Sequence, residues 1–276
     1  MEYYRVMKDI RLIMGMPIEI EIVAPDAGDT LEKAFAYLVS VDERFSTYKE
    51  GSEISRINRG EIVPPDARPV RDKDSESPGR PMAGVSNGAS ADMHEVFAIA
   101  EKTKQETDGY FDMRKPDGSV DPSGIVKGWA IKNTATLIRS SGYENYFVNA
   151  GGDIAMDGTN ADGKDWSVGI RNPFKIDEIV KVVYPRGKGI ATSGSYLRGA
   201  HIYNPHAPKE ELLDIVSITV IGSDVLEADR FATAVFAMGK GGVHFVEKLQ
   251  GFEAYTIDAH GIATMTSGFG VYTQSR

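Results

Sequence analysis

Residues 120–158 constrain the fold of this chain more than any other stretch. They read VDPSGIVKGWAIKNTATLIRSSGYENYFVNAGGDIAMDG. Asp121 opens a Pro-Ser-Gly turn, and the apolar residues after it recur near helical spacing up to Gly142, which predicts a helix with a glycine stop. A short apolar strand at residues 146–148 then leads into a glycine-rich turn at 149–153. Glycine lets a backbone approach a ligand closely, and helix N-termini attract anions. The stretch therefore fits either an ordinary helix–strand unit or one wall of an anion site.

The composition excludes several classes of protein. A formal net charge of −9 makes a nucleic-acid surface a poor fit. The chain has no cysteine, which rules out disulfides, thiolate metal ligands and a lipid-anchored cysteine. No apolar run is long enough to span a bilayer, so we expect no membrane anchor and a cytoplasmic protein. With 276 residues and 41% hydrophobic residues, we expect one domain over residues 1–276.

The order of the expected elements favours an α+β fold. Loose alternation at residues 3–13 and strict alternation at 17–22 predict two strands, and a helical apolar pattern follows at 31–45. No run of βαβ units occurs, so we expect mixed, mostly antiparallel sheets with packed helices. The remaining elements that we expect are strands at 166–171, 179–184, 189–192, 215–221 and 270–273, helices at 223–239 and 243–249, and a hairpin at 254–264.

Two stretches between these elements are less regular. Residues 45–58 are rich in polar side chains and are predicted to form a surface loop. Residues 64–91 hold five prolines, mixed charges and little periodicity, which predicts a flexible insertion rather than a domain linker. A capping-box pattern at residues 92–95 then predicts the start of a helix at 96–107.

Asp229 and Thr233 are the clearest candidates for binding a metal ion. They lie four residues apart in an expected helix, so both oxygens share one face. A carboxylate and a hydroxyl, joined by a loop carbonyl, suit a hard cation such as Mg²⁺, which keeps some waters and takes phosphate oxygens. The pair alone fits an ordinary helix surface equally well.

Other catalytic patterns are missing or ambiguous. The five histidines lack HExxH spacing, and the chain has no P-loop, GxGxxG or GxSxG motif, although Ser193 in TSGS suggests comparison with acyl hydrolases. His201 and His206 flank a turn at residues 204–205. Each fits either a base near a bound phosphate or a residue that stabilises the turn.

Eight motifs occur in a fixed order between Met14 and Phe269. They are MGM, FSTYKEGSEISRIN, TDGYFD, DPSGIVKGWA, NAGGDI, ATSGSY, HIYNP and EADRFATA. In sequence and order the series resembles the ApbE family of FAD:protein FMN transferases. The resemblance implies FAD as substrate, Mg²⁺ as cofactor, and transfer of FMN to a Thr or Ser hydroxyl of an acceptor flavoprotein, with release of AMP.

The resemblance also implies roles for individual residues. Gly124, through its carbonyl, is expected to bind Mg²⁺ together with the side chains of Asp229 and Thr233. His201 matches the family histidine that acts as a base toward the acceptor hydroxyl. Tyr48 is expected against the isoalloxazine ring. The other residues expected to line the FAD site are Met14, Tyr110, Phe111, Asp112, Asp121 and Lys127.

The chain departs from the family pattern at three motif positions. Met16 replaces a threonine, Val126 replaces an alanine, and Asn204 replaces an aspartate near His201. Two alternatives to the transferase remain open. One is an FAD pyrophosphatase that yields free FMN and AMP, and the other is a non-catalytic FAD-binding protein.

Overall fold

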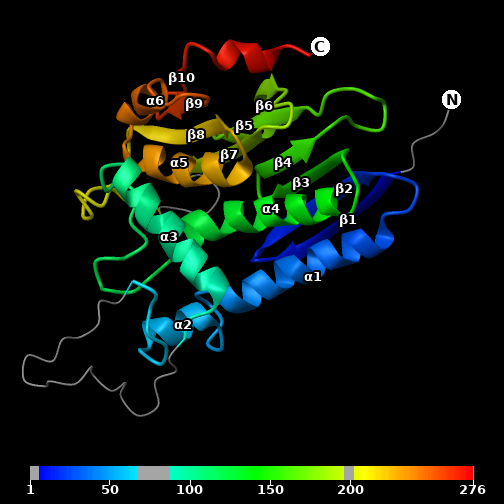
Figure 1. Ribbon diagram of the computed structural model, residues 1–276. Coiled ribbons are helices and arrows are strands. Elements are labelled where there is room, and N and C mark those ends of the chain that lie inside the picture. The colour runs from blue at the N-terminus through cyan, green and yellow to red at the C-terminus, as the bar shows by residue number, and fades with distance from the viewer. Residues whose placement is uncertain (1–5, 67–87, 196–201, 276) are drawn as a thin grey trace, which may run out of the picture.

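The computed structural model describes residues 6–66, 88–195 and 202–275, and its centre is an antiparallel sheet of eight strands (Figure 1). The strand order is β1-β2-β3-β4-β7-β8-β9-β10. These strands are β1 (Val6–Ile13), β2 (Met16–Val23), β3 (Tyr146–Ala150), β4 (Asp153–Asp157), β7 (Gly189–Gly194), β8 (Ile215–Gly222), β9 (Glu253–Asp258) and β10 (Ala263–Met265). A second sheet pairs β5 (Val168–Asn172) with β6 (Lys175–Val183). The α+β prediction is confirmed.

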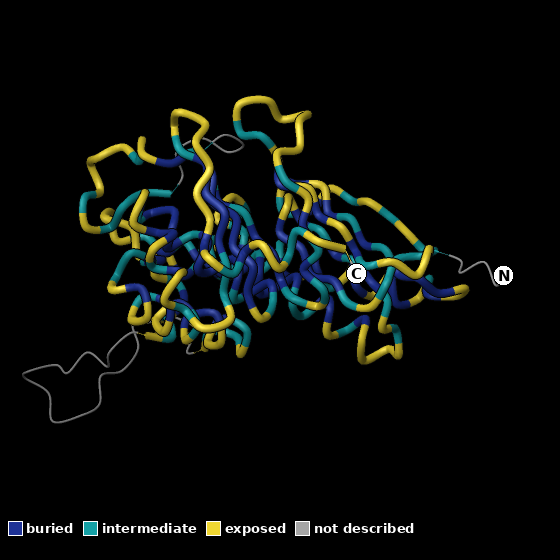
Figure 2. Tube along the Cα trace, turned by 90° about the horizontal axis from the view of Figure 1, so that it is seen from above, coloured by how far each residue is buried: buried dark blue, intermediate teal, exposed yellow. Residues whose placement is uncertain are grey.

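Helices cover one face of the large sheet, and the small sheet covers part of the other (Figure 1). The helices are α1 (Gly28–Phe45), α2 (Glu53–Asn58), α3 (Ala91–Glu106), α4 (Ser123–Ser140), α5 (Val225–Ala237) and α6 (Gly241–Val246). In Figure 2 the buried residues run through the middle of the molecule, and exposed loops surround them. None of the helices in the described ranges is long and apolar enough to cross a membrane.

Burial along the strands follows from these layers. In β2, Ile18, Ile20 and Ile22 are buried under the helices, while the alternating Glu19 and Glu21 face the opposite side. In β4, by contrast, both faces are buried, because α4 and α5 lie over one face and the β5–β6 sheet packs against the other. The site described below lies beside this doubly covered part of the sheet.

Close packing of α4 against α5 depends on Gly128. A Cβ atom at this position would lie 2.8 Å from Cβ of Asp229 and 3.0 Å from Cα of Leu226, so any larger residue would push the two helices apart. This contact brings together residues that are about a hundred positions apart in the sequence. The hydrogen bond between Gly128 of α4 and Asp229 of α5 is one example.

Four sequence predictions need correction. The loop predicted at 45–58 contains α2, whose N-cap Ser52 accepts a hydrogen bond from the Ser55 amide. Helix α3 begins at Ala91 rather than at residue 96, because the hydroxyl of Ser90 caps it and residues 92–95 form its first turn.

Strand β4 was not predicted, and residues 270–273 are not a strand but part of a 3₁₀ helix, η1 (Phe269–Thr273). Phe269 is fully buried and packs against the ring of Tyr255 at a centroid distance of 5.5 Å, which holds this segment over the sheet instead of within it. The predicted insertion at 64–91 falls largely on residues 67–87, outside the described residues.

Candidate active site

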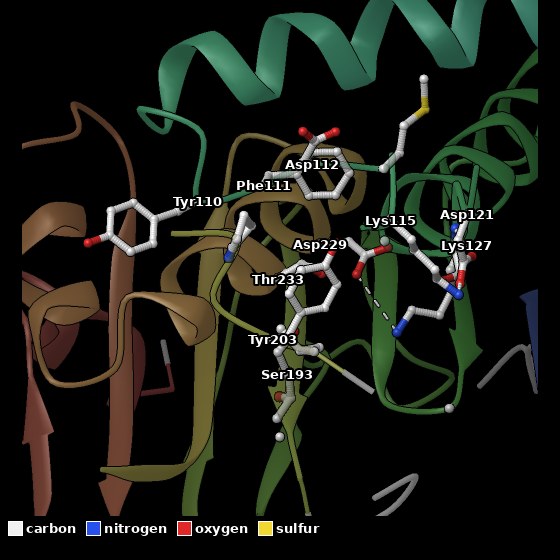
Figure 3. A pocket seen from close by; sticks show the side chains of 18 residues that line it. Tyr110, Phe111, Asp112, Lys115, Asp121, Lys127, Ser193, Tyr203, Asp229 and Thr233 are labelled. Carbon is white, nitrogen blue, oxygen red and sulfur yellow. Dashed lines mark hydrogen bonds and ion pairs between the residues drawn. The ribbon is translucent and has the colours of Figure 1, made fainter. Parts of the chain in front are cut away.

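A cavity of about 120 Å³ lies where α4, α5, β7 and the segment after α3 meet (Figure 3). Most of the predicted site residues line it: Tyr110, Phe111, Asp112, Asp121, Gly124, Lys127, Asp229 and Thr233. Pockets that enclose a drug-sized ligand usually measure about 300–1,000 Å³. The cavity therefore has room for only part of a ligand as large as a dinucleotide.

Two predicted residues do not line the cavity, and a third cannot be placed relative to it. Met14 lies in the turn between β1 and β2 with φ of 54°, partly buried against the core beneath α1 and α4. Tyr48 is 96% exposed. His201 lies outside the described residues.

Two buried carboxyl groups and one ammonium group lie together at the site; Lys127 and Asp229 line the cavity, and Asp153 lies behind them against Lys127. Asp229 accepts a hydrogen bond from the Gly128 amide at 2.8 Å, and Asp153, the first residue of β4, accepts one from the Thr192 amide at 3.1 Å. Lys127 forms an ion pair with Asp153 and lies 3.8 Å from Oδ1 of Asp229. Figure 3 shows Lys127 reaching toward Asp229, with the contact drawn as a dashed line. We call Lys127, Asp153 and Asp229 the inner cluster.

The inner cluster holds two carboxyl groups but one ammonium group. Burial raises the pKa of Asp229 well above its usual range; Lys127 opposes this shift, and the neighbouring Asp153 adds to it. One ammonium group faces two carboxylates that are almost inaccessible to water, with side-chain exposures of 0% for Asp153 and 4% for Asp229. A cation bound beside Asp229 would relieve this imbalance.

The donors around Asp229 fit a small hard cation. A Cβ atom at Gly124 would lie 3.1 Å from Cγ2 and 3.4 Å from Oγ1 of Thr233, so the first turn of α4 directly contacts this side chain of α5. Asp229 lies one helical turn before Thr233 on α5. Within the described ranges no group of three or more His, Asp or Glu side chains could hold a metal by itself. Mg²⁺ commonly needs only one or two carboxylates, because waters and substrate phosphates complete its coordination.

A hairpin over residues 113–121 forms the outer wall. The Lys115 amide donates to the Ser119 carbonyl at 2.8 Å, and Asn58 from α2 makes two hydrogen bonds to the backbone of Val120. The ammonium of Lys115 lies 2.7 Å from Oδ2 of Asp121. We call Lys115 and Asp121 the outer pair.

Both members of the outer pair have shifted pKa values. The hydrogen bond that Lys115 donates to Asp121 raises the pKa of Lys115. Burial is the largest single influence on Asp121 and raises its pKa, but hydrogen bonds from Lys115 and Ser123 together outweigh it and lower the pKa. Sequence reasoning missed Lys115, because no motif or periodicity marks it.

His206 stabilises the wall instead of entering the cavity. Its Nε2 lies 2.9 Å from the carbonyl oxygen of Asp108, and its ring packs edge-on against Tyr110 at 4.6 Å. Asn204 accepts a hydrogen bond from the His206 amide at 2.9 Å, so this departure from the family pattern holds the turn. Ser193 lines the cavity, and none of the described residues that line the cavity with it is a histidine.

Comparison with known sequences adds independent information. The sequence model described as the ApbE family matches residues 14–115 and 113–256. An FAD:protein FMN transferase of Vibrio cholerae is 27% identical over 239 residues, which cover 74% of this chain and 71% of the relative. One of Escherichia coli strain K12 is 26% identical over 279 residues, covering 87% and 80%.

Solved structures share the fold. The flavin transferase ApbE from Vibrio cholerae superposes with a TM-score of 0.79 at 23% identity, over 97% of this chain and 99% of that one. An ApbE protein from Thermotoga maritima gives a TM-score of 0.80 at 19% identity, over 98% and 100%.

Proposed function

Because the chain belongs to the ApbE family, we propose that it transfers FMN from FAD to a Thr or Ser hydroxyl of an acceptor flavoprotein, with Mg²⁺ as cofactor and AMP as the leaving group. The curated relatives named above are FAD:protein FMN transferases. The observation that carries the proposal is the inner cluster, whose two carboxyl groups share one ammonium group and lie near Gly124 and Thr233.

Three groups of this chain would hold the metal ion: the Gly124 carbonyl, the Asp229 carboxylate and the Thr233 hydroxyl. Mg²⁺ bound there would spread the negative charge of the pyrophosphate as it is cleaved. Lys127 keeps the carboxylates of Asp153 and Asp229 close together despite their like charge. The amides of Gly128 and Thr192 fix the orientation of the same two carboxylates.

The chemical step exchanges one P–O bond for another. The acceptor oxygen forms a bond to the flavin-side phosphorus, the bond from that phosphorus to the bridging oxygen breaks, and AMP leaves with the bridging oxygen. The proton of the acceptor hydroxyl passes to a base. His201 is the proposed base, and Asp153 is the next candidate.

Measuring AMP in three mixtures tests the proposal. The protein is incubated with FAD and Mg²⁺ alone, with an acceptor flavoprotein added, and with an acceptor whose target hydroxyl is removed. A transferase releases AMP only with the intact acceptor. Release of AMP without an acceptor would identify an FAD pyrophosphatase, and FAD binding without any AMP would identify a binding protein.

Replacing His201 tests the assignment of the base. We expect His201→Ala to abolish flavin transfer while FAD and Mg²⁺ still bind, because only proton removal is lost. His206→Ala is the control, since His206 contacts the Asp108 carbonyl and does not line the cavity. Full transfer activity in His201→Ala would assign the base elsewhere, and Asp153→Asn would be tested next.

A further inference from the structure

Lys115 and Lys127 both line the cavity, but they differ in how much of their charge is compensated. Lys127 contacts the carboxylates of both Asp153 and Asp229, and its side chain is 18% exposed. Lys115 forms an ion pair with the single carboxylate of Asp121, and its side chain is 42% exposed. Lys127 is therefore occupied with carboxylates, while Lys115 has solvent access on the cavity side.

Lys115 can exchange its present partner, the Asp121 carboxylate, for a more strongly charged anion. The side chains of Lys115 and Asp121 are 42% and 22% exposed, so water competes for the partners of this ion pair more than for those of the inner cluster. A phosphate oxygen offers a charge-assisted hydrogen bond with more negative charge than one carboxylate. An anion that enters the cavity is thus expected to draw the ammonium of Lys115 away from Asp121.

The backbone under Lys115 is held firmly enough to anchor a ligand. The bridge between Arg114 and Val120 closes the hairpin, and Asn58 of α2 both donates a hydrogen bond to the Val120 carbonyl and accepts one from the Val120 amide.

We propose that Lys115 is the metal-independent anchor for the phosphates of the ligand, and that it makes the site prefer a pyrophosphate-bearing flavin over riboflavin. This inference rests on the proposed function for the identity of the ligand. Lys127 is less available for this role, because it already contacts the carboxyl groups of both Asp153 and Asp229. Lys115 forms an ion pair with one carboxylate, and it can exchange that partner for an anion in the cavity when Mg²⁺ is absent.

Binding measurements in EDTA test this role without any turnover. The affinities of wild type and Lys115→Gln for FAD, riboflavin and inorganic pyrophosphate are measured by flavin fluorescence and calorimetry. We expect Lys115→Gln to lose about tenfold in affinity for FAD and pyrophosphate, since a charge-assisted contact is removed. Riboflavin binding should stay unchanged, and Lys115→Arg should retain most of the affinity for FAD.

Lys132→Gln is a matched control. Lys132 is also 42% exposed and pairs with one carboxylate, Asp224, at 2.8 Å, but it does not line the cavity. The Lys132→Gln variant should bind FAD, riboflavin and pyrophosphate with the same affinities as wild type. Wild-type affinity of Lys115→Gln for FAD and pyrophosphate would overturn the proposal, as would an equal loss for riboflavin, which indicates a structural role.

The same data separate this inference from the proposed function. If wild type binds pyrophosphate in a manner that depends on Lys115 but does not bind FAD even with Mg²⁺, the anchor stands and the flavin transferase fails. If wild type releases AMP from FAD only with the intact acceptor, and Lys115→Gln binds FAD as tightly as wild type in EDTA, the transferase stands and the anchor fails. Failure of wild type to bind either ligand in EDTA would overturn the anchor, and failure to bind FAD with Mg²⁺ as well would overturn both.

Discussion

The inner cluster and the outer pair use the same chemical groups in opposite surroundings. Asp153 and Asp229 are almost fully buried, and backbone amides of α4 and β7 fix their orientation. Asp121 and Lys115 are 22% and 42% exposed, on a hairpin at the wall. A lysine that contacts aspartate can therefore belong to two different kinds of site. Its burial, and the number of carboxyl groups for each ammonium group, decide whether the site attracts a cation or an anion.

The difference has an energetic reason. Removing one partner from a buried ion pair leaves an uncompensated charge in a medium that solvates it poorly. In an exposed pair, water can take the place of either partner at a small cost in free energy. The inner cluster contains two carboxylates and one ammonium, so it gains from an added cation. The outer pair is balanced and accessible, so either partner can be exchanged.

The largest effect is expected from Asp229→Asn, which removes one inner charge and keeps the shape of the side chain. We expect Mg²⁺-dependent AMP release to fall by several orders of magnitude, because the one charged metal ligand is lost. The thermal midpoint of the metal-free protein should stay the same or rise, since the ionised form of Asp229 is disfavoured by burial. Thr233→Val should reduce AMP release less, because water can replace one neutral ligand.

A normal rate of AMP release by Asp229→Asn at sub-millimolar Mg²⁺ would exclude Asp229 as the metal ligand. A large fall in its thermal midpoint would show instead that Asp229 serves mainly to hold α5 against α4.

The second effect concerns stability and compares the two lysines. Lys127→Met should lower the free energy of unfolding by about 3–5 kcal/mol without Mg²⁺, because the buried carboxylate of Asp153 then loses its ion-pair partner. Lys115→Met should lower it by less than about 1 kcal/mol, as expected for an exposed pair. Urea unfolding in EDTA measures both values. Equal losses would show that the two sites do not differ in the way that their burial suggests.

The smallest effect is expected outside both clusters, at Tyr48. An aromatic stack contributes about 0.5–1.5 kcal/mol beyond its buried area, so Tyr48→Ala should weaken FAD and riboflavin binding by up to about tenfold. AMP binding and the thermal midpoint should not change, because the side chain is 96% exposed. Since Lys115→Gln should spare riboflavin, the two variants separate ring recognition from phosphate recognition. Equal losses for riboflavin and AMP in Tyr48→Ala would exclude a contact with the flavin ring.

Much of the fold could be predicted from local patterns in the sequence. Gly142 ends the helix after residue 140 with φ of 93°, as its position after the periodic residues indicates. The spacing of Asp229 and Thr233 correctly places both on α5 and at one cavity. Each of these predictions depends only on residues within one or two helical turns.

Features that depend on distant contacts could not be found in this way. The meeting of Lys127, Asp153 and Asp229 requires α4, β4 and α5 to pack together, and no local pattern encodes that packing. Residues 270–273 look like a strand by composition, but burial of Phe269 against the sheet decides their conformation. Lys115 has no sequence signal, and only the hairpin brings it to Asp121.

The most direct test of the division between metal site and phosphate anchor is the effect of Mg²⁺ on FAD affinity. The ratio of FAD affinities with and without Mg²⁺ is measured in wild type, Asp229→Asn and Lys115→Gln, under conditions without an acceptor. We expect Mg²⁺ to tighten FAD binding in wild type and to the same degree in Lys115→Gln, and to have no effect in Asp229→Asn. Equal tightening by Mg²⁺ in Asp229→Asn and wild type would contradict the assignment of the metal to the inner cluster.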